Sequence, residues 1–394
     1  MSEADVFKIR LQNKISEAGL SQFPPERYRL SEDEPDPDAI VVRSASLLQA
    51  EFGENLKAIA RAGTGVNNIP VTACTERGIA VFNTPGANAN GVKELVIAAM
   101  LLSARRIYQG IGWTQSLAGL DEGIPKAVEK GKAAFAGPEI RGKRLGVIGL
   151  GAVGVMVAND ASALGMDVIG YDKYLTLSSA WGLSRAVGRA ASLEQLLATS
   201  DYITIHVPLN DSTRLMLGER AFDLMKPGTR LINLARGELV DHQALLAAID
   251  SGRLACYVTD FPSADTLGLD KVITLPHLGA STPESEDNCA VMAVRQVRDF
   301  LEQGIVTNSV NFPDCGFVTT QDIRIIVAHL NVPNMIGQIT TTLAASKLNI
   351  TELLNQHREG LGYTIIDVEG DFDPWVVEDV RAIEGVKMAR VVAS

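Results

Sequence analysis

Residues 144–173, RLGVIGLGAVGVMVANDASALGMDVIGYDK, decide the fold class of this chain. The apolar run at the start of this stretch predicts a buried strand, and the turn after it carries Gly149-x-Gly151-x-x-Gly154. The small residues that follow predict a helix, and a second apolar run predicts the next strand. Strand, glycine turn, helix and strand in this order predict a βαβ unit that binds a dinucleotide.

Each special position of this unit has a physical reason. Gly149 allows the tight turn, Gly151 lets a pyrophosphate approach backbone N–H groups, and Gly154 lets helix and strand pack closely. Asp172 closes the second strand, where a carboxylate binds the adenine ribose and repels a 2′-phosphate, so NAD is expected rather than NADP. A purely structural glycine turn is the alternative. The cofactor site is expected to include two further turn residues, Ala152 and Val153.

The alternation of apolar runs and turns continues on both sides of this unit. The runs that follow it, YITIHVP, TRLINLA, CYVTDF and KVITLP, bring the predicted strands to six, enough for one doubly wound parallel sheet. The runs that precede it, DAIVVRS, LKAIARAGTGV and GIAVFNTPG, predict strands of a second parallel sheet. A long apolar helix is expected near 91–107. Ligands are expected at the carboxyl ends of the strands.

The end of the chain has a different pattern. After a helix predicted at 284–303, the last 72 or so residues predict strand, helix, strand, strand, helix, strand, which is a small α+β unit of the split βαβ type. The expected domains are a substrate-binding domain (1–88 and 281–308), an NAD-binding domain (89–280), a linker (309–321) and a regulatory domain (322–394).

Composition and charge narrow the class of protein. Hydrophobic residues make up 46% and charged residues 21%, as in soluble globular proteins. The net charge of −11 argues against nucleic acid or an anionic membrane as the main partner. Four cysteines lie far apart with no CxxC pair, which favours reduced thiols. Neither a signal peptide nor an apolar run of membrane-spanning length is present, so a cytoplasmic enzyme is expected, and no metal site is predicted.

Four polar residues follow the predicted strands of the cofactor-binding sheet: Arg236, Asp260, Asp265 and His277. Surface ion pairs and solvated loop acids are the alternative interpretation. Hydride transfer from a 2-hydroxy acid, however, needs such a set. A guanidinium holds the substrate carboxylate, an imidazole exchanges the hydroxyl proton, and a carboxylate orients the imidazole.

With these residues the chain resembles the D-isomer-specific 2-hydroxyacid dehydrogenases. The resemblance is carried by RAGTGVNNI, GIAVFNTPGANANGVKELV, GLGAVG, NLARGELVD and LPHLGAST. It implies that Arg236 and His277 are catalytic. The family's catalytic acid is normally a glutamate in an F-P-x-E-P context. Aligning on the F-P pair puts Ala264 at that position, whereas an ungapped count puts Asp265 there and Asp260 beside the nicotinamide. We prefer the ungapped count, because it gives both acids a role.

The same resemblance implies the rest of the fold and the cofactor site. It predicts an α/β protein with a Rossmann-type doubly wound NAD domain, a flavodoxin-like substrate domain and a C-terminal ferredoxin-like (ACT) α+β domain. The implied NAD contacts beyond those already named are Val207, Pro208, Leu234, Ala235, Arg236, Asp260, His277, Gly279 and Ala280.

Within the family, the chain is most similar to the members that act on phosphoglycerate. This implies oxidation of 3-phosphoglycerate to 3-phosphohydroxypyruvate, the first step of phosphorylated serine synthesis. The implied substrate contacts are Arg43, Ser44, Arg61, Thr64, Gly65, Asn88, Arg236 and His277. Two solvated strand-end arginines are the alternative for Arg43 and Arg61. A dehydrogenase for another D-2-hydroxy acid, and a nucleotide-sensing corepressor-like binding protein, are the alternative functions.

The C-terminal unit resembles an ACT domain, a small-molecule sensor that often pairs with a neighbour. In serine-inhibited relatives a histidine and an asparagine of the first loop bind serine, together with an asparagine before the second strand. These match His329, Asn331 and Asn349. L-serine is therefore the expected effector and a homodimer or homotetramer the expected assembly. A purely structural dimerisation module is the alternative.

Overall fold

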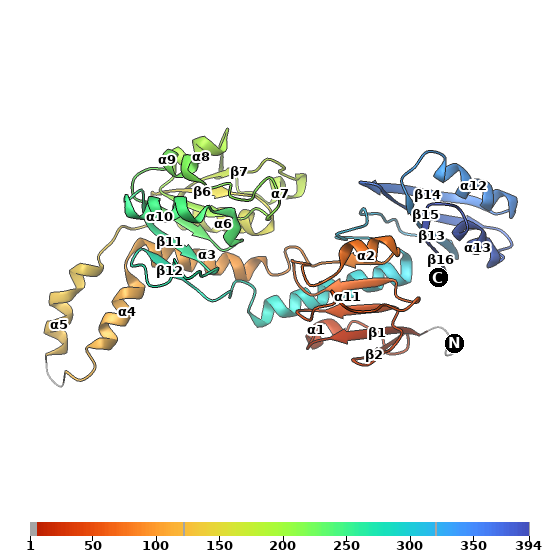
Figure 1. Cartoon of the computed structure of the whole chain (residues 1–394), viewed down its shortest axis with the longest axis horizontal. Coiled ribbons are helices and arrows are strands. Elements are labelled where there is room, and N and C mark those ends of the chain that lie inside the picture. The colour runs from red at the N-terminus through yellow and green to blue at the C-terminus, as the bar shows by residue number, and fades with distance from the viewer. Residues whose placement is uncertain (1–5, 121–122, 320, 394) are drawn as a thin grey trace. The chain divides into compact units, whose positions relative to one another are not determined.

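A computed structural model describes residues 6–120, 123–319 and 321–393 of the chain. Two compact units are present (Figure 1). One runs from Asn88 to Ser285, and the other combines the chain up to Ala87 with the chain from Glu286 onward. The unit Asn88–Ser285 is therefore formed by one continuous segment, whereas the other unit is formed by the two segments on either side of it.

The unit Asn88–Ser285 contains a seven-stranded parallel sheet. Its strand order is β12-β11-β10-β9-β6-β7-β8, so the order reverses between β6 and β9, where a doubly wound sheet forms its ligand crevice. The strands are β6 (Arg144–Ile148), β7 (Asp167–Tyr171), β8 (Gly188–Arg189), β9 (Tyr202–Ile205), β10 (Thr229–Asn233), β11 (Leu254–Thr259) and β12 (Val272–Thr274).

Helices cover both faces of this sheet because its strands are apolar on both sides. On β6, Leu145 and Val147 pack with α3 and α6, whereas Ile148 packs with the cluster formed by α8, α9 and α10. The helices are α3 (Ala89–Ala104), α6 (Ala152–Ala163), α7 (Leu177–Gly182), α8 (Leu193–Thr199), α9 (Glu219–Leu224), α10 (His242–Asp250) and the 3-10 helix η3 (Gly237–Leu239).

An arm projects from this unit between α3 and β6 (Figure 1). It consists of α4 (Ile107–Ser116), α5 (Ile124–Gly131) and the 3-10 helix η2 (Lys132–Phe135). Neither α4 nor α5 has a buried residue among those described. The Trp113 and Phe135 rings, 5.2 Å apart, pack α4 against η2.

The other unit contains a five-stranded parallel sheet of order β2-β1-β3-β4-β5. Helix α11 packs on it through Ala290, Ala293, Val297 and Phe300, which share one face of the helix. The strands are β1 (Phe7–Gln12), β2 (Tyr28–Ser31), β3 (Ala39–Val42), β4 (Ala58–Arg61) and β5 (Ala80–Phe82). The helices are α1 (Glu17–Leu20), α2 (Val71–Glu76) and α11 (Pro283–Gln303), which begins three residues before the unit boundary.

The same unit carries a four-stranded antiparallel sheet of order β14-β15-β13-β16. Ile325 and Val327 of β13 pack under its two helices, whereas Ile326 and Ala328, on the opposite face, pack in the cluster that contains α11. The elements are β13 (Ile323–Leu330), α12 (Met335–Ala345), β14 (Asn349–Arg358), β15 (Leu361–Glu369), α13 (Trp375–Arg381) and β16 (Val386–Ala393).

The predicted fold class is confirmed, including the doubly wound sheet and the βαββαβ order at the end of the chain. Three strands were not predicted. Strand β8 has only two residues, and β1 and β2 mix polar with apolar residues, so that Ile9 is the one residue of β1 that is fully buried. None of the helices in the described part of the chain is long and apolar enough to cross a membrane.

Candidate functional site

The glycine turn lies between β6 and α6, at the point where the strand order reverses. Gly149 has a φ of 90°, and a Cβ added there would lie 2.8 Å from the carbonyl carbon of His206. A Cβ on Gly154 would lie 1.9 Å from the Gly149 oxygen, so only glycine fits. A Cβ on Gly151, by contrast, would meet no described atom within 4 Å. The turn is therefore tight on its protein side and open at the N-terminus of α6, as phosphate binding requires.

Asp172 follows β7 and is held by two backbone groups. Its Oδ2 accepts a hydrogen bond from the Leu150 N–H at 2.7 Å, and its Oδ1 accepts from the Tyr174 N–H at 2.7 Å. These bonds fix the carboxylate beside the glycine turn. Each oxygen has a second lone pair, which suits the paired hydroxyls of a ribose.

The segment after β9 faces the glycine turn from the other side of the crevice. It contains Val207 and Pro208, two of the predicted cofactor contacts, and also His206, which the sequence pattern did not single out. The His206 Nε2 lies 3.0 Å from the Thr204 hydroxyl, and burial lowers the pKa of this imidazole to about 4. His206 is therefore neutral near pH 7. Its position at a strand end beside the switch point is the signal that could have identified it.

Asn233, another residue that the sequence pattern did not single out, shapes the loop after β10. It is fully buried. Its Nδ2 donates to the Arg236 carbonyl at 2.8 Å, and its Oδ1 accepts from the Ala235 N–H at 3.2 Å. The loop that contains Leu234 is thereby folded back on the strand end, and the Arg236 side chain is exposed.

Asp260, directly after β11, is the buried acid of the site. It is 2% exposed, and among the described residues its Oδ1 has no hydrogen-bond partner. Burial raises the pKa of the Asp260 carboxyl, and the nearby charges of His277 and Arg236 oppose that rise. The rings of Phe261 and His277 meet edge to face at 4.9 Å. The structure therefore brings Arg236, Asp260 and His277 together at the carboxyl ends of neighbouring strands.

These residues fit a bound NAD. The unpaired Asp260 oxygen can accept a hydrogen bond from the nicotinamide amide, while Asp172 and the open turn at Gly151 fit the other half of the dinucleotide. NAD supplies the acceptor for the hydride. The predicted contacts Gly279 and Ala280 follow β12, and a Cβ added to Gly279 would lie 3.9 Å from the Asp260 Oδ2.

Asp265 does not lie where the resemblance implied. Its Oδ2 lies 3.0 Å from the Nε2 of His242, the first residue of α10. Within the described part of the chain, Asp265 and His277 make no contact. An aspartate is one methylene shorter than the family's glutamate, and His242 offers a partner within reach. The Asp265 side chain is 64% exposed, so this pair is open to solvent.

The predicted substrate contacts are divided between the two units. Arg43, Ser44, Arg61, Thr64 and Gly65 belong to the unit with the five-stranded sheet, whereas Asn88, Arg236 and His277 belong to the other unit.

Arg43 follows β3, Arg61 is the last residue of β4, and the two residues frame the loop 62–66. The Arg43 Nη2 pairs with the Glu286 carboxylate at 2.7 Å. The Arg61 Nε donates to the Arg43 carbonyl at 2.9 Å, and its Nη1 donates to the Gly65 carbonyl. Arg61 therefore supports the backbone of the loop in addition to bringing positive charge to it.

The three residues predicted to bind serine do not meet within one chain. His329 is 1% exposed, and its ring nitrogens lie 2.8 Å from the Leu330 carbonyl and 2.9 Å from the Thr364 hydroxyl. In the register of the sheet, His329 pairs with Gly362 at one end, whereas Asn349 pairs with Glu369 at the other. Asn331 follows β13 at the His329 end. A site containing all three would therefore need residues from two copies of the sheet.

The sequence of residues 97–279 matches the profile of the D-isomer specific 2-hydroxyacid dehydrogenase NAD-binding domain. A D-3-phosphoglycerate dehydrogenase of Archaeoglobus fulgidus is 34% identical over 92% of this chain and 68% of its own length. One from Escherichia coli K12 is 32% identical over 92% of this chain and 88% of its own length. The chain belongs to the D-isomer-specific 2-hydroxyacid dehydrogenase family. It is an NAD-dependent oxidoreductase.

Lengths differ among the relatives of this dehydrogenase. A D-3-phosphoglycerate dehydrogenase of Methanocaldococcus jannaschii is 36% identical, and the match covers 81% of this chain but 60% of the relative. Among solved structures, the NAD+-bound 3-phosphoglycerate dehydrogenase of Entamoeba histolytica is similar with a TM-score of 0.60 and 26% identity, over 78% of this chain and 99% of that one. D-mandelate dehydrogenase of Rhodotorula graminis, with a TM-score of 0.65 and 24% identity over 80% of this chain and 99% of that one, shares the fold.

Proposed function

We propose that this enzyme oxidises 3-phosphoglycerate to 3-phosphohydroxypyruvate. The observation that carries the substrate is the pair of arginines, Arg43 and Arg61, at one loop of an otherwise acidic protein. A phosphate and a carboxylate together need such a local concentration of guanidinium and backbone donors. The D-3-phosphoglycerate dehydrogenases among the relatives support the same substrate.

Each residue of the site has a distinct role in this proposal. Arg236 holds the substrate carboxylate and polarises the C2 oxygen. His277 takes the proton of the C2 hydroxyl. Asp260 faces the nicotinamide, where its free oxygen fixes the orientation of the amide. Asp265, in an exposed loop, exchanges His242 for His277 when substrate is bound and stabilises the imidazolium.

Assaying NADH production from 3-phosphoglycerate tests this proposal directly. Arg236→Gln and His277→Ala are each expected to lower turnover by on the order of 10²–10⁴-fold, because each removes one positioned group from the transition state. NADH binding, measured by fluorescence, should stay near that of the parent enzyme. Near-normal turnover in His277→Ala, or no activity of the parent enzyme with 3-phosphoglycerate, would contradict the assignment.

We further propose that residues 322–394 form an ACT-type regulatory domain, that L-serine inhibits the enzyme, and that it binds where two copies of the four-stranded sheet meet. The separation of His329 and Asn349 along the sheet favours a site shared between two chains. Asn331 and Asn349 supply amide donors and acceptors that suit a zwitterion.

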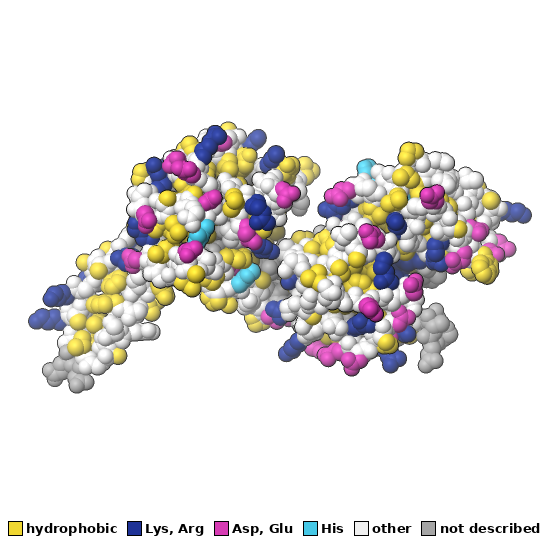
Figure 2. Space-filling model, viewed as in Figure 1, with side chains coloured by type: hydrophobic (Ala, Val, Ile, Leu, Met, Phe, Trp, Pro, Cys, Tyr) yellow, Lys and Arg dark blue, Asp and Glu magenta, His cyan; other side chains and the backbone are white. Residues whose placement is uncertain are grey.

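A homo-oligomer, dimeric or tetrameric, is part of this proposal. Figure 2 shows apolar side chains on the surface of the arm. The exposed ones include Tyr108 and Ile111 of α4, Ile124 of α5, and Leu120 between the two helices. Their exposure would be costly in water, and a second copy of the chain would cover them.

A further inference from the structure

An open cleft of about 580 Å³ lies within the unit that contains the five-stranded and four-stranded sheets. Its volume suits a small metabolite. Three segments line it: the turn after β5, the connection 308–314 and the end of β14. None of its lining residues belongs to the proposed active site or to the proposed serine site. The lining residues are Asn83, Pro85, Asn308, Ser309, Val310, Pro313, Asp314, Gln356, His357 and Arg358.

The cleft presents charges of both signs. The Arg358 Nη1 donates to the Ser309 carbonyl at 2.7 Å, which fixes the guanidinium and leaves further N–H donors for an anion. The Asp314 Oδ1 accepts from the Asn308 N–H at 2.8 Å, which leaves the second carboxylate oxygen for a cation. The lining also includes the side chains of Gln356 and His357 and is apolar only at its prolines and Val310. A ligand of this cleft must therefore be polar.

We propose that this cleft binds a small α-amino acid, with the ligand carboxylate at Arg358 and the ligand ammonium at Asp314. A simple anion would be repelled by the Asp314 carboxylate, and a simple cation by the Arg358 guanidinium. A zwitterion satisfies both groups at once. The planar guanidinium also matches the geometry of a carboxylate.

The walls of the cleft connect to the loop 62–66, to which the proposed function assigns substrate binding. The Ser309 hydroxyl donates to the Val81 carbonyl at 3.0 Å, and the Val310 N–H donates to the same carbonyl at 2.8 Å. Two residues farther on, the Asn83 Nδ2 donates to the Thr64 carbonyl at 2.6 Å. A ligand bound to Arg358 and Asp314 contacts the segment 308–314, which is hydrogen-bonded to the strand that precedes Asn83, so occupancy alters the mobility of the loop 62–66.

Calorimetric titration of the full chain with L-serine, L-alanine and L-aspartate tests the proposal. At least one of them should bind, and Arg358→Ala and Asp314→Asn should each weaken that binding by about tenfold or more, since each removes a charged partner. Arg358→Lys keeps the charge but loses the planar fork, so partial weakening is expected. Propionate and ethylamine, which carry one charge each, should bind far more weakly than the amino acid.

Two controls separate this cleft from other sites. Lys387→Ala, on the opposite edge strand β16, should not change the titration, and Asn349→Ala should keep the binding that Arg358→Ala loses. No heat from any of the three amino acids at millimolar concentration would overturn the proposal, as would binding that survives when Asp314→Asn or Arg358→Ala is combined with Asn349→Ala, which removes the proposed serine site. Amide hydrogen exchange at residues 62–66 should slow on binding, and unchanged exchange would overturn the coupling. The titration and the hydrogen exchange both measure binding and do not require turnover. Their outcome is therefore independent of the assay with 3-phosphoglycerate.

Discussion

Asp260 and Asp265 come from the same strand end and meet opposite surroundings. Asp260 is buried and its Oδ1 has no partner in the described part of the chain, whereas Asp265 is mostly exposed and pairs with His242. A buried carboxyl resists ionisation, and an exposed one does not need a fixed partner. The two acids therefore respond differently to the same substitution.

Asp260→Asn should weaken NADH binding, because the amide presents an NH₂ group toward a nicotinamide donor. The parent enzyme should itself lose NADH affinity as the pH falls. Since burial raises the pKa of Asp260, this loss should begin above the pH range in which an ordinary aspartate protonates. Fluorescence titration of NADH from neutral to acidic pH measures both effects. An Asp260→Asn variant that still shows the parent's pH dependence would assign the effect to another group.

Asp265→Asn should keep NADH affinity and lower kcat/KM for 3-phosphoglycerate. A carboxylate that supports His277 stabilises the imidazolium that forms when the hydroxyl proton is transferred, so its removal disfavours the transition state. His242→Asn is the matched control, because it frees Asp265 without removing it. If Asp265→Asn leaves kcat/KM unchanged, Asp265 is a partner of His242 alone.

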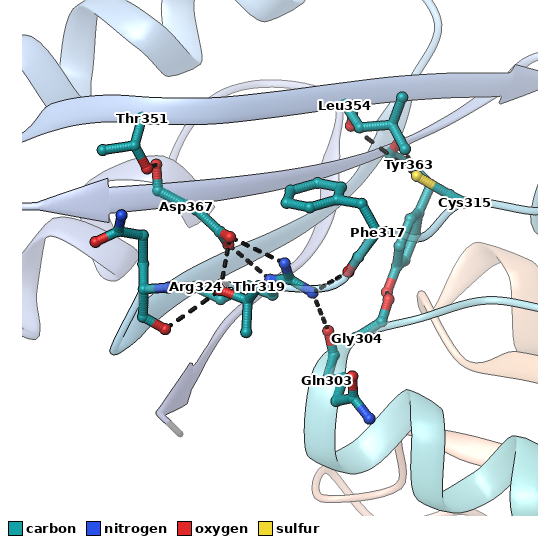
Figure 3. A network of polar contacts seen from close by, with 11 residues as sticks. Gln303, Gly304, Cys315, Phe317, Thr319, Arg324, Thr351, Leu354, Tyr363 and Asp367 are labelled. Atoms are coloured by element: carbon teal, nitrogen blue, oxygen red, sulfur yellow. Dashed lines mark hydrogen bonds and ion pairs between the residues drawn. The ribbon is translucent and has the colours of Figure 1, made fainter.

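At the scale of elements, side chains of the four-stranded sheet donate hydrogen bonds to the carbonyl groups at the C-terminus of α11. The last carbonyls of a helix have no partner within the helix. Here Arg324 Nη1 donates to the Gln303 carbonyl at 3.0 Å, the Tyr363 hydroxyl donates to Gly304 at 2.8 Å, and Arg390 Nη1 donates to Leu301 at 3.1 Å (Figure 3 shows the first two). Cationic side chains at a helix C-terminus also interact favourably with the helix dipole.

Arg324 is the centre of this network. Its Nε and Nη2 bind the Asp367 carboxylate at 2.6 and 2.9 Å, and its guanidinium lies over the Phe317 ring at 4.3 Å (Figure 3). Both partners of the ion pair are 2% exposed. The geometry is bidentate and Nη1 also donates to the Gln303 and Phe317 carbonyls, which meets the condition under which a buried ion pair is tolerated.

Arg324→Met should lower the free energy of unfolding by about 3–5 kcal/mol, because it leaves the Asp367 carboxylate buried without a counter-charge. The double variant Arg324→Met with Asp367→Leu should recover much of that loss. Glu378→Gln, which breaks the half-exposed pair with Arg381, should cost less than about 1 kcal/mol. Urea unfolding followed by circular dichroism compares the three. If Arg324→Met lowers the free energy of unfolding no more than Glu378→Gln does, the buried ion pair contributes little to stability.

Periodicity in the sequence located the strands and helices that have strong apolar patterns. The glycine turn, Asp172 and the strand ends accordingly lie at the positions that the pattern predicts. The pattern did not locate Asn233 or His206, whose roles depend on which loops face each other across the crevice. Nor did it predict the Asp265–His242 pair, because residues 23 positions apart meet only when α10 packs beside the loop after β11.

At the scale of the whole molecule, regulation by L-serine requires two chains. Asn331→Ala and Asn349→Ala should each abolish inhibition by L-serine while leaving turnover. When the two variant chains are co-expressed, the mixed dimer has one site with both substitutions and one site with neither, so inhibition should partly return. Inhibition curves of the separated species measure this. Mixed dimers that stay insensitive to L-serine would exclude a site shared in this way.

The discontinuous unit has a consequence for the synthesis of the chain. Strands β1–β5 leave the ribosome early, but α11, whose Ala293, Val297 and Phe300 complete their core, follows only after the whole of Asn88–Ser285. At roughly 5–20 residues per second, those intervening residues, about 200 of them, take on the order of 10–40 s to translate. Throughout that time the apolar face of the five-stranded sheet is not covered by α11. We therefore expect chaperones to bind this face of the nascent chain while the NAD-binding unit folds.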